Sequence, residues 1–143
     1  MAVKPIPEGY RTVTPYLAVR GLPKLLEFVR ETFDAKIIHV MDGPDGKPGH
    51  AEFEIGDSKL MAGEASGKWP PVGCSLYLYV PDTDAVYRKA LAAGAESVME
   101  PTNQFYGDRN AGVKDEHGIW WWIGTHIEDV SPEELQRRAA ARK

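Results

Sequence analysis

The chain has 143 residues, a length that corresponds to one ordinary folded domain. Hydrophobic residues make up 43% and charged residues 27%, which is typical of a globular, water-soluble protein and argues against a disordered one. The net charge of −4 gives no basic surface of the kind that nucleic-acid binding requires, and no apolar run approaches the ~20 residues of a membrane span. We therefore expect neither a nucleic acid nor a membrane as a partner.

The single cysteine and the amino-terminal sequence bear on the cellular compartment. Cys74 has no second cysteine with which to form an internal disulfide, and residues 1–9 lack the apolar stretch of a secretory signal. A lone cysteine with no histidine near it in sequence is also more typical of an inert side chain than of a nucleophile. The sequence predicts a cytoplasmic protein.

Two similar segments, each of which predicts a β-strand, indicate that the chain repeats itself. They are Val13–Val19 and Cys74–Val80, and the offset that relates Val19 to Val80 also relates Tyr16 to Tyr77. The chain is thus expected to consist of consecutive parts. These are a tail over 1–9, a first βαβββ module over 10–65, a linker over 66–73, a second βαβββ module over 74–130 and a C-terminal helix over 131–143.

The same order of elements is predicted within each module. Apolar residues fall at helical spacing from Leu22 to Phe33, and Asp82 or Asp84 can cap a second helix that stops at Gly94. Three strands follow each helix. They are expected at 36–41, 50–55 and 58–62 in the first module and at 96–100, 111–115 and 119–125 in the second.

Side chains along each predicted first strand alternate between two faces. In the second module Leu76 and Leu78 form an apolar face that can pack against the helix, whereas Ser75, Tyr77 and Tyr79 form a polar, aromatic face. One module is too small to cover both faces of its sheet. We therefore expect an α+β fold in which two tandem βαβββ modules form a curved eight-stranded sheet around a cavity.

Several stretches together carry a family resemblance. They are residues 14–19, 49–57, 76–80, 104–109 and 125–130. In their order and spacing the chain resembles the vicinal oxygen chelate superfamily, which includes glyoxalase I, bleomycin-resistance proteins and extradiol dioxygenases, and most of all its PhnB-like branch. The resemblance implies the glyoxalase/bleomycin-resistance fold, with a cavity made by paired modules, often across a dimer. A homodimer is therefore expected.

The resemblance also locates the positions where metal-using members hold an ion. Two ligands come from the first strands and two from the last strands, and they are usually His, Gln or Glu. In this chain those positions hold Thr14 or Tyr16, Ser75 or Tyr77, Leu60, and Trp122. Because none of these is an imidazole or a carboxylate, we expect no metal and no other cofactor, and a bound divalent metal would contradict the main hypothesis.

Other residues could supply chemistry in place of a metal. His50 and Glu52 are two positions apart on one predicted strand and therefore share a face, which makes them weak catalytic candidates. The second module is expected to offer only Ala111 and Val113 opposite them. Arg109 could contact an anionic ligand, although pairing with Asp108 in a loop is the plainer expectation.

These observations favour a binding protein over an enzyme. The main hypothesis is metal-independent binding of a small planar or aromatic molecule in an aromatic-lined cavity. The expected cavity residues are Thr14, Tyr16, Leu60, Ser75, Tyr77, Tyr79, Trp120 and Trp122. Two alternatives stay open: a metal-dependent lyase, isomerase or dioxygenase with relocated ligands, and a dimeric protein-interaction domain.

Overall fold

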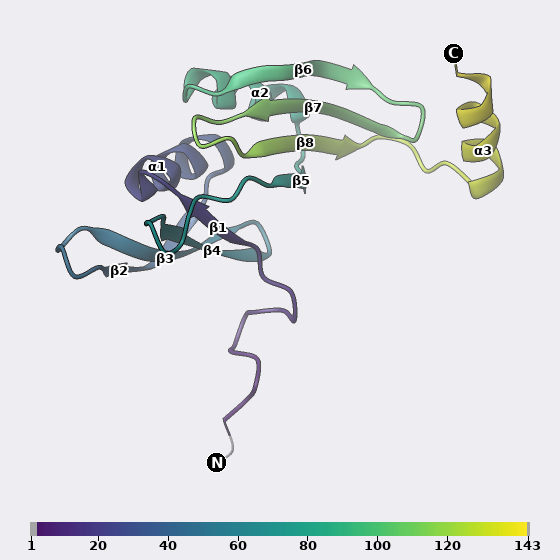
Figure 1. Ribbon diagram of the computed structural model, residues 1–143. Coiled ribbons are helices and arrows are strands. Elements are labelled where there is room, and N and C mark those ends of the chain that lie inside the picture. The colour runs from purple at the N-terminus through teal and green to yellow at the C-terminus, as the bar shows by residue number, and fades with distance from the viewer. Residues whose placement is uncertain (1–2, 143) are drawn as a thin grey trace. The chain divides into compact units, whose positions relative to one another are not determined.

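A computed structural model describes residues 3–142, and within that range it contains three helices and eight strands (Figure 1). The chain divides between Gly73 and Cys74 into two compact units. Each unit contains one four-stranded sheet and repeats the element order βαβββ, so the structure confirms the α+β fold and the repeat. The described strands pair into two separate four-stranded sheets and not into the single eight-stranded sheet that the sequence predicts. No helix of the described chain has both the length and the apolar character needed to cross a bilayer.

The first unit is built on a mixed sheet with strand order β1-β4-β3-β2. Strand β1 (Tyr16–Val19) runs parallel to β4 (Ser58–Glu64), while β3 (Pro48–Ile55) runs antiparallel to both β4 and β2 (Lys36–Asp42). Helix α1 (Leu22–Phe33) covers one face of this sheet. The buried side chains between them include Leu17, Val19, Leu25, Val29, Phe53, Leu60 and Ala62.

Helix α1 begins where the apolar periodicity predicts. Gly21 precedes it with a φ of 86°, in the left-handed region that favours glycine. The Glu64 carboxylate accepts hydrogen bonds from the backbone N–H groups of Gly21 and Leu22, both at 2.9 Å. A side chain from β4 therefore satisfies donors at the helix start that an N-cap residue would otherwise serve.

The second unit repeats this topology with strand order β5-β8-β7-β6. Strand β5 (Ser75–Tyr79) runs parallel to β8 (Trp120–His126), and β7 (Asp108–Lys114) runs antiparallel to β8 and to β6 (Glu96–Asn103). Helix α2 (Thr83–Ala92) packs on this sheet. Strand β7 begins at Asp108, three positions earlier than the sequence predicts, and this places more polar residues in the sheet.

The predicted cap of α2 and the predicted C-terminal helix are confirmed. Asp82, rather than Asp84, caps α2, because its Oδ1 accepts from the Ala85 N–H at 3.1 Å. Ser131 caps α3 (Pro132–Ala141), and its Oγ accepts from the Glu134 N–H at 3.2 Å. Acidic residues in the first turn of α3 and an arginine in its last turn suit the helix dipole.

A buried carboxylate organises the turn between β7 and β8. Asp115 is 5% exposed, and it accepts from the N–H groups of His117 at 2.8 Å and Ile119 at 3.0 Å and from Trp121 Nε1 at 2.9 Å. Burial alone would raise the pKa of Asp115, but its hydrogen bonds hold that pKa below the usual value. The same carboxylate therefore stabilises the backbone of the turn and satisfies the indole N–H of the fully buried Trp121.

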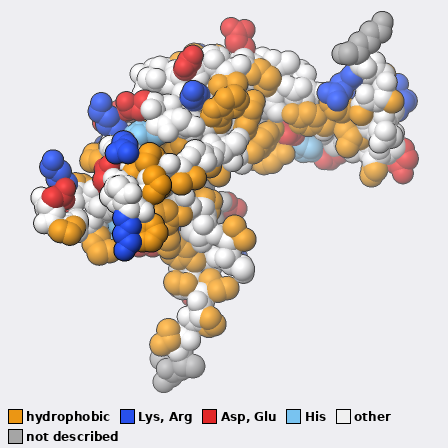
Figure 2. All heavy atoms as spheres, in the orientation of Figure 1, with side chains coloured by type: hydrophobic (Ala, Val, Ile, Leu, Met, Phe, Trp, Pro, Cys, Tyr) orange, Lys and Arg blue, Asp and Glu red, His pale blue; other side chains and the backbone are white. Residues whose placement is uncertain are grey.

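Both units also expose hydrophobic side chains (Figure 2). Among the large exposed ones are Tyr16, Trp69, Tyr77, Tyr79, Tyr106 and Trp120. Exposed aromatic side chains of this kind can contact a flat partner or ligand.

Candidate functional site

The pairing of the first and last strands is the same in both units. Tyr16 of β1 pairs with Met61 of β4, and Tyr77 of β5 pairs with Trp122 of β8. Met61 is therefore the counterpart of Trp122, and the expectation that Leu60 occupies this position is corrected. A shift of one residue along a strand moves a side chain to the opposite face of the sheet.

The displaced register has a physical cause in the hairpin turns. The sequence-based alignment counts four residues from the glycine of each hairpin turn, which leads from Gly56 to Leu60 and from Gly118 to Trp122. The two turns, however, differ in length. Ile55 pairs with Ser58 across a two-residue turn, whereas Lys114 pairs with Trp120 across a longer one. Leu60 consequently lies under α1 and is 5% exposed, so it does not share the aromatic face.

His50 and Glu52 lie on one face of β3, as their spacing predicts, and both have partners there. His50 Nδ1 is 3.4 Å from the Tyr16 hydroxyl, and the Tyr10 hydroxyl donates to Glu52 Oε1. Burial, together with the Glu52 carboxylate, raises the pKa of Tyr10 to about 12. Tyr10 of the tail thus covers Glu52. The Glu52 carboxylate is engaged by the Tyr10 hydroxyl and is not a free acid or base.

The positions in the second unit that correspond to His50 and Glu52 are Asn110 and Gly112. Pairing shows this directly, because His50 and Asn110 each pair with a glycine at the same point of the last strand, Gly63 and Gly124. The expected counterparts Ala111 and Val113 are both fully buried on the helix side. Sequence reasoning therefore missed Asn110 as a residue of the aromatic face.

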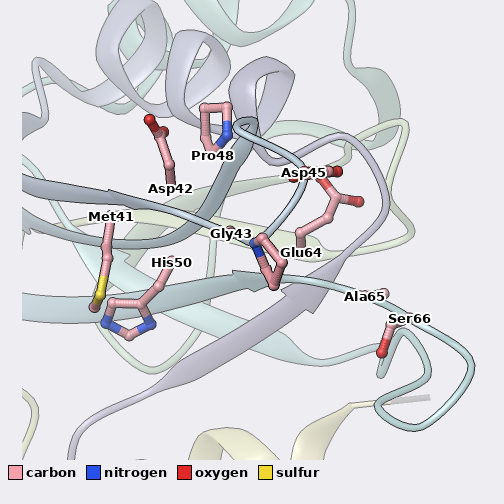
Figure 3. Close-up of a pocket in the computed structure, with 11 residues that line it drawn as sticks. Met41, Asp42, Gly43, Asp45, Pro48, His50, Glu64, Ala65 and Ser66 are labelled. Atoms are coloured by element: carbon pink, nitrogen blue, oxygen red, sulfur yellow. The ribbon is translucent and has the colours of Figure 1, made fainter.

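The first unit contains a hollow of about 510 Å³ beside the β2–β3 turn (Figure 3). Its lining includes His50 and the carboxylates of Asp42, Asp45 and Glu64. Glu64 is bound to the start of α1, and Asp45 Oδ1 accepts from the Lys47 N–H at 2.9 Å. The hollow has no aromatic ring other than the imidazole in its lining, so it offers little surface for stacking.

Two further predicted site residues lie elsewhere. Thr14 precedes β1, and its hydroxyl donates to the Arg11 carbonyl at 3.5 Å. Arg109 forms a bidentate pair with Asp84 of α2, at 2.7 and 2.8 Å, and also donates to Asn103. These contacts tie Arg109 to α2, and the described residues show no pairing of Arg109 with Asp108.

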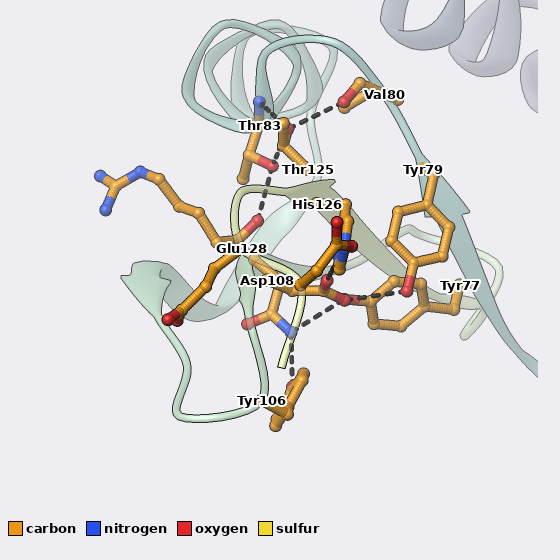
Figure 4. Close-up of polar contacts among 12 residues, drawn as sticks. Tyr77, Tyr79, Val80, Thr83, Tyr106, Asp108, Thr125, His126 and Glu128 are labelled. Carbon is orange, nitrogen blue, oxygen red and sulfur yellow. Dashed lines mark hydrogen bonds and ion pairs between the residues drawn. The ribbon is translucent and has the colours of Figure 1, made fainter. Parts of the chain in front are cut away.

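A cluster of polar side chains surrounds Asp108, at the start of β7 (Figure 4). Asp108 is 4% exposed, and its Oδ2 accepts from the hydroxyls of Tyr77 at 2.7 Å and Tyr79 at 2.9 Å. Its Oδ1 lies 3.0 Å from Nδ1 of His126, whose Nε2 lies 2.7 Å from Asp129. The two predicted cavity tyrosines are thus anchored by a carboxylate that sequence reasoning assigned elsewhere.

The electrostatics of this cluster keep Asp108 ionised. Burial raises the pKa of Asp108, but hydrogen bonds from His126, Tyr77 and Tyr79 outweigh burial and lower it. Hydrogen bonds with Asp108 and Asp129 in turn raise the pKa of His126. Burial and the Asp108 charge raise the pKa of Tyr77, so its hydroxyl keeps its proton and acts as a donor.

Next to this cluster is a pocket of about 340 Å³. It is lined by Tyr77, Met99, Gln104, Tyr106, Asn110 and Trp122. Asn110 is 2% exposed, and its Nδ2 donates to the hydroxyls of Tyr77 at 3.0 Å and Tyr106 at 2.7 Å. Three aromatic rings and a buried amide therefore meet in one small concave site, a composition common in binding pockets for small molecules.

Glycines in the strands allow the pocket rings to lie flat on the sheet. A Cβ at Gly124 would lie 2.5 Å from the Tyr77 hydroxyl, and a Cβ at Gly112 would lie 2.5 Å from the Trp122 ring. Space, rather than backbone conformation, therefore requires glycine at both positions. Trp122 is further fixed because its Nε1 donates to Ser75 Oγ at 2.9 Å.

Helix α3 holds the turn that carries Tyr106. Arg138 donates to the Phe105 carbonyl at 3.0 Å and forms a bidentate pair with Glu128, with both distances 2.9 Å. The Arg142 guanidinium lies 4.2 Å from the centre of the Phe105 ring. The predicted C-terminal helix thus supports one wall of the pocket.

We expect Arg138→Ala to speed amide hydrogen exchange in the turn at residues 104–107 about threefold to tenfold, because the turn then loses its tie to α3. Arg137→Ala is the matched control, since among the described residues Arg137 pairs with Glu134 on the surface of α3. Hydrogen exchange followed by mass spectrometry measures the rates in both variants. Equal rates in the two variants would show that α3 does not hold the turn.

The alternation of polar residues could have revealed the missed part of the site. Asp108, Asn110 and Gly112 occupy alternate positions of β7 and share one face. Extending the predicted strand back to Asp108 would have placed the first two beside the tyrosines. Tyr106 and Gln104 lie in the adjoining segment, and no pattern in the sequence indicates that they turn toward the pocket.

Comparison with known proteins identifies the family of the chain. Residues 11–123 match the Glyoxalase/Bleomycin resistance protein/Dioxygenase superfamily, and the chain belongs to that family. An uncharacterized protein of Mycobacterium bovis is 32% identical over 135 residues, which cover 87% of this chain and 89% of that protein.

Two solved structures share the fold at low sequence identity. TioX from Micromonospora sp. ML1 has a TM-score of 0.70 at 20% identity and covers 82% of this chain and 99% of its own. A PhnB protein from Bacillus cereus, described as a putative 3-demethylubiquinone-9 3-methyltransferase, has a TM-score of 0.65 at 19% identity, with coverages of 80% and 99%. The predicted resemblance to PhnB-like proteins is confirmed at the level of the fold.

The residues at the superfamily's metal positions do not fit a divalent ion. The family resemblance, combined with the strand pairing, implies that these positions are Tyr16, Met61, Tyr77 and Trp122. None of them supplies an imidazole or a carboxylate, the groups that hard and borderline cations prefer. Within residues 3–142, no three His, Cys, Asp or Glu side chains gather in an arrangement that could hold a metal.

Proposed function

We propose that this protein binds a small planar or aromatic molecule, without a metal, in the pocket of the second unit. The observation that carries the proposal is the convergence of Tyr77, Tyr106 and Trp122 around a 340 Å³ cavity whose polar floor, Asn110, is already hydrogen bonded. The rings offer faces for stacking, and Tyr77 and Asn110 are held in place before any ligand arrives. Such preorganisation lowers the entropy lost on binding.

The size of the stacking contribution sets the expected affinity range. An aromatic pair contributes about 0.5–1.5 kcal/mol beyond the burial of its area, so one ring accounts for up to about tenfold in affinity. The net charge of −4 adds a slight preference for cationic ligands. A planar cation such as proflavine is therefore a suitable first probe.

Titration of the protein with proflavine, berberine and acridone is expected to quench tryptophan fluorescence saturably. Trp122→Leu should weaken binding about tenfold, because it removes one stacking face while keeping apolar volume. Trp69→Phe is the matched control, since Trp69 is 67% exposed and belongs to the other unit. Linear, non-saturable quenching by every compound of such a panel would contradict the proposal.

We further propose that the protein is a homodimer, as the superfamily resemblance suggests. The exposed aromatic residues, among them Tyr79 at 65% and Trp120 at 39%, support a partner surface. Sedimentation velocity measures the mass of the assembly directly. A monomer at all concentrations tested would exclude the dimer and leave the pocket proposal intact.

A further inference from the structure

The hydrogen bonds around the pocket have a fixed direction that begins at Asp108. An ionised carboxylate can only accept, so the Tyr77 hydroxyl must donate its one proton to Asp108 Oδ2, 2.7 Å away. The Tyr77 oxygen also lies 3.0 Å from Nδ2 of Asn110. With its proton already committed, Tyr77 can only accept at this second contact.

This requirement determines which way the Asn110 amide faces. Its NH₂ group must point at Tyr77, and the same nitrogen lies 2.7 Å from the Tyr106 hydroxyl, so the second amide proton is donated to Tyr106. Its carbonyl oxygen accordingly accepts from Gln104 Nε2 at 2.9 Å. The direction of each of these side-chain hydrogen bonds of Asn110 therefore follows from the negative charge of Asp108.

As a result, the Tyr106 hydroxyl oxygen accepts a hydrogen bond from Asn110, and the hydroxyl proton of Tyr106 is not used in that bond. In the described part of the chain, that proton has no protein acceptor. Tyr106 lines the pocket and is 38% exposed, and α3 holds its turn through Arg138. A ligand in the pocket thus meets a hydroxyl that can donate and whose oxygen is already engaged.

We infer that the pocket selects, among planar molecules, those that present a carbonyl oxygen or an equivalent acceptor to the Tyr106 hydroxyl. The inference rests on the proposed function and specifies the ligand class for the same site. A ligand without such an acceptor would leave the Tyr106 proton unpaired on binding, and leaving a donor unsatisfied weakens binding more than a missing contact does.

Two planar tricyclic probes of similar size test this inference. Acridone and carbazole both carry a ring N–H, but only acridone carries a ring carbonyl. Equilibrium dialysis of the full chain should show acridone bound about tenfold more tightly than carbazole. Tyr106→Phe should weaken acridone binding, because the carbonyl loses its donor, and strengthen carbazole binding, because no donor is left unpaired, which brings the ratio close to one.

A second substitution tests the direction of the network. In Asn110→Asp the NH₂ group is replaced by an acceptor of the same shape, so the Tyr106 proton is expected to turn inward and the preference for acridone to disappear. Circular dichroism of each variant checks that it is folded, and Tyr106→Phe is a mild change at a partly exposed ring.

The possible results separate the inference from the proposed function. Equal binding of both probes by the wild-type chain, or an unchanged ratio in Tyr106→Phe, would overturn the inference while the binding function stands. Binding of neither probe would count against both. A wild-type preference for acridone that is lost in Tyr106→Phe would support both.

Discussion

Replacing Asp108 with asparagine is expected to weaken proflavine binding at least about tenfold and to lower the free energy of unfolding by about 2 kcal/mol. The carboxylate accepts hydrogen bonds from Tyr77 and Tyr79 and pairs with His126. An amide offers one acceptor oxygen and turns two N–H groups toward donors, so at least one partner loses its acceptor. Fluorescence titration and urea unfolding measure the two effects.

Asp129→Asn provides the matched control, because Asp129 is fully exposed and, among the described residues, contacts the cluster through His126 alone. It should bind and unfold nearly as the wild type does. If Asp108→Asn matched this control in both measurements, the cluster would have no role in orienting the pocket tyrosines.

The same cluster gives a signed pH dependence of stability. The pKa of His126 is raised, so its contribution is complete below its unfolded pKa near 6.5 and is lost as the pH rises through the folded pKa. The pKa of Asp108 is lowered, so its contribution is present above the unfolded value near 3.8 and is lost as the pH falls through the folded pKa. Urea unfolding across this range should show both losses in the wild type and a flatter profile in Asp108→Asn.

Asp115→Ala is expected to have the largest effect on stability, about 3 kcal/mol or more. It strands the buried Trp121 indole N–H and two backbone donors, at His117 and Ile119, and each unsatisfied buried donor costs about 1–3 kcal/mol. Chemical unfolding followed by near-ultraviolet circular dichroism reports the loss, because Trp121 is fully buried.

Asp57→Ala is the corresponding change in the β3–β4 turn. Asp57 is exposed, and within residues 3–142 its carboxylate accepts from the Ser58 hydroxyl alone, so we expect a loss within about 0.5 kcal/mol. Equal losses for the two variants would show that burial of Asp115 is not what stabilises the second unit.

The fold could be predicted from local patterns because each element carries its own signal. Apolar spacing from Leu22 to Phe33 and the capping residues Asp82 and Ser131 give helices that the structure confirms. Strand ends were less certain, since the polar residues at the start of β7 resemble a loop until their partners on β8 are known. The alternation of side chains along a strand predicts which face of the sheet a residue occupies, but it does not predict the residue at which pairing with the next strand ends.

The candidate site depends on contacts between residues that are far apart in the sequence, and local sequence patterns do not predict such contacts. Asp108 meets Tyr77 and Tyr79, which are 31 and 29 positions away, and no local pattern joins them. Tyr77 and Trp122 were placed on one face correctly because alternation within strands is local. Leu60 was misplaced because its position depended on the length of a turn, and one residue of error reverses a strand's faces.

The central claim is that the pocket of the second unit binds a planar molecule without a metal, and its most direct test is one titration performed twice. Proflavine is titrated against protein treated with a chelator and desalted, and against the same protein supplied with Zn²⁺, Ni²⁺, Mn²⁺ or Fe²⁺. We expect saturable quenching with the same midpoint in both states, because Tyr16, Met61, Tyr77 and Trp122 do not suit a divalent ion. Quenching that saturates only after a metal is restored, at near-stoichiometric metal content, would contradict the claim.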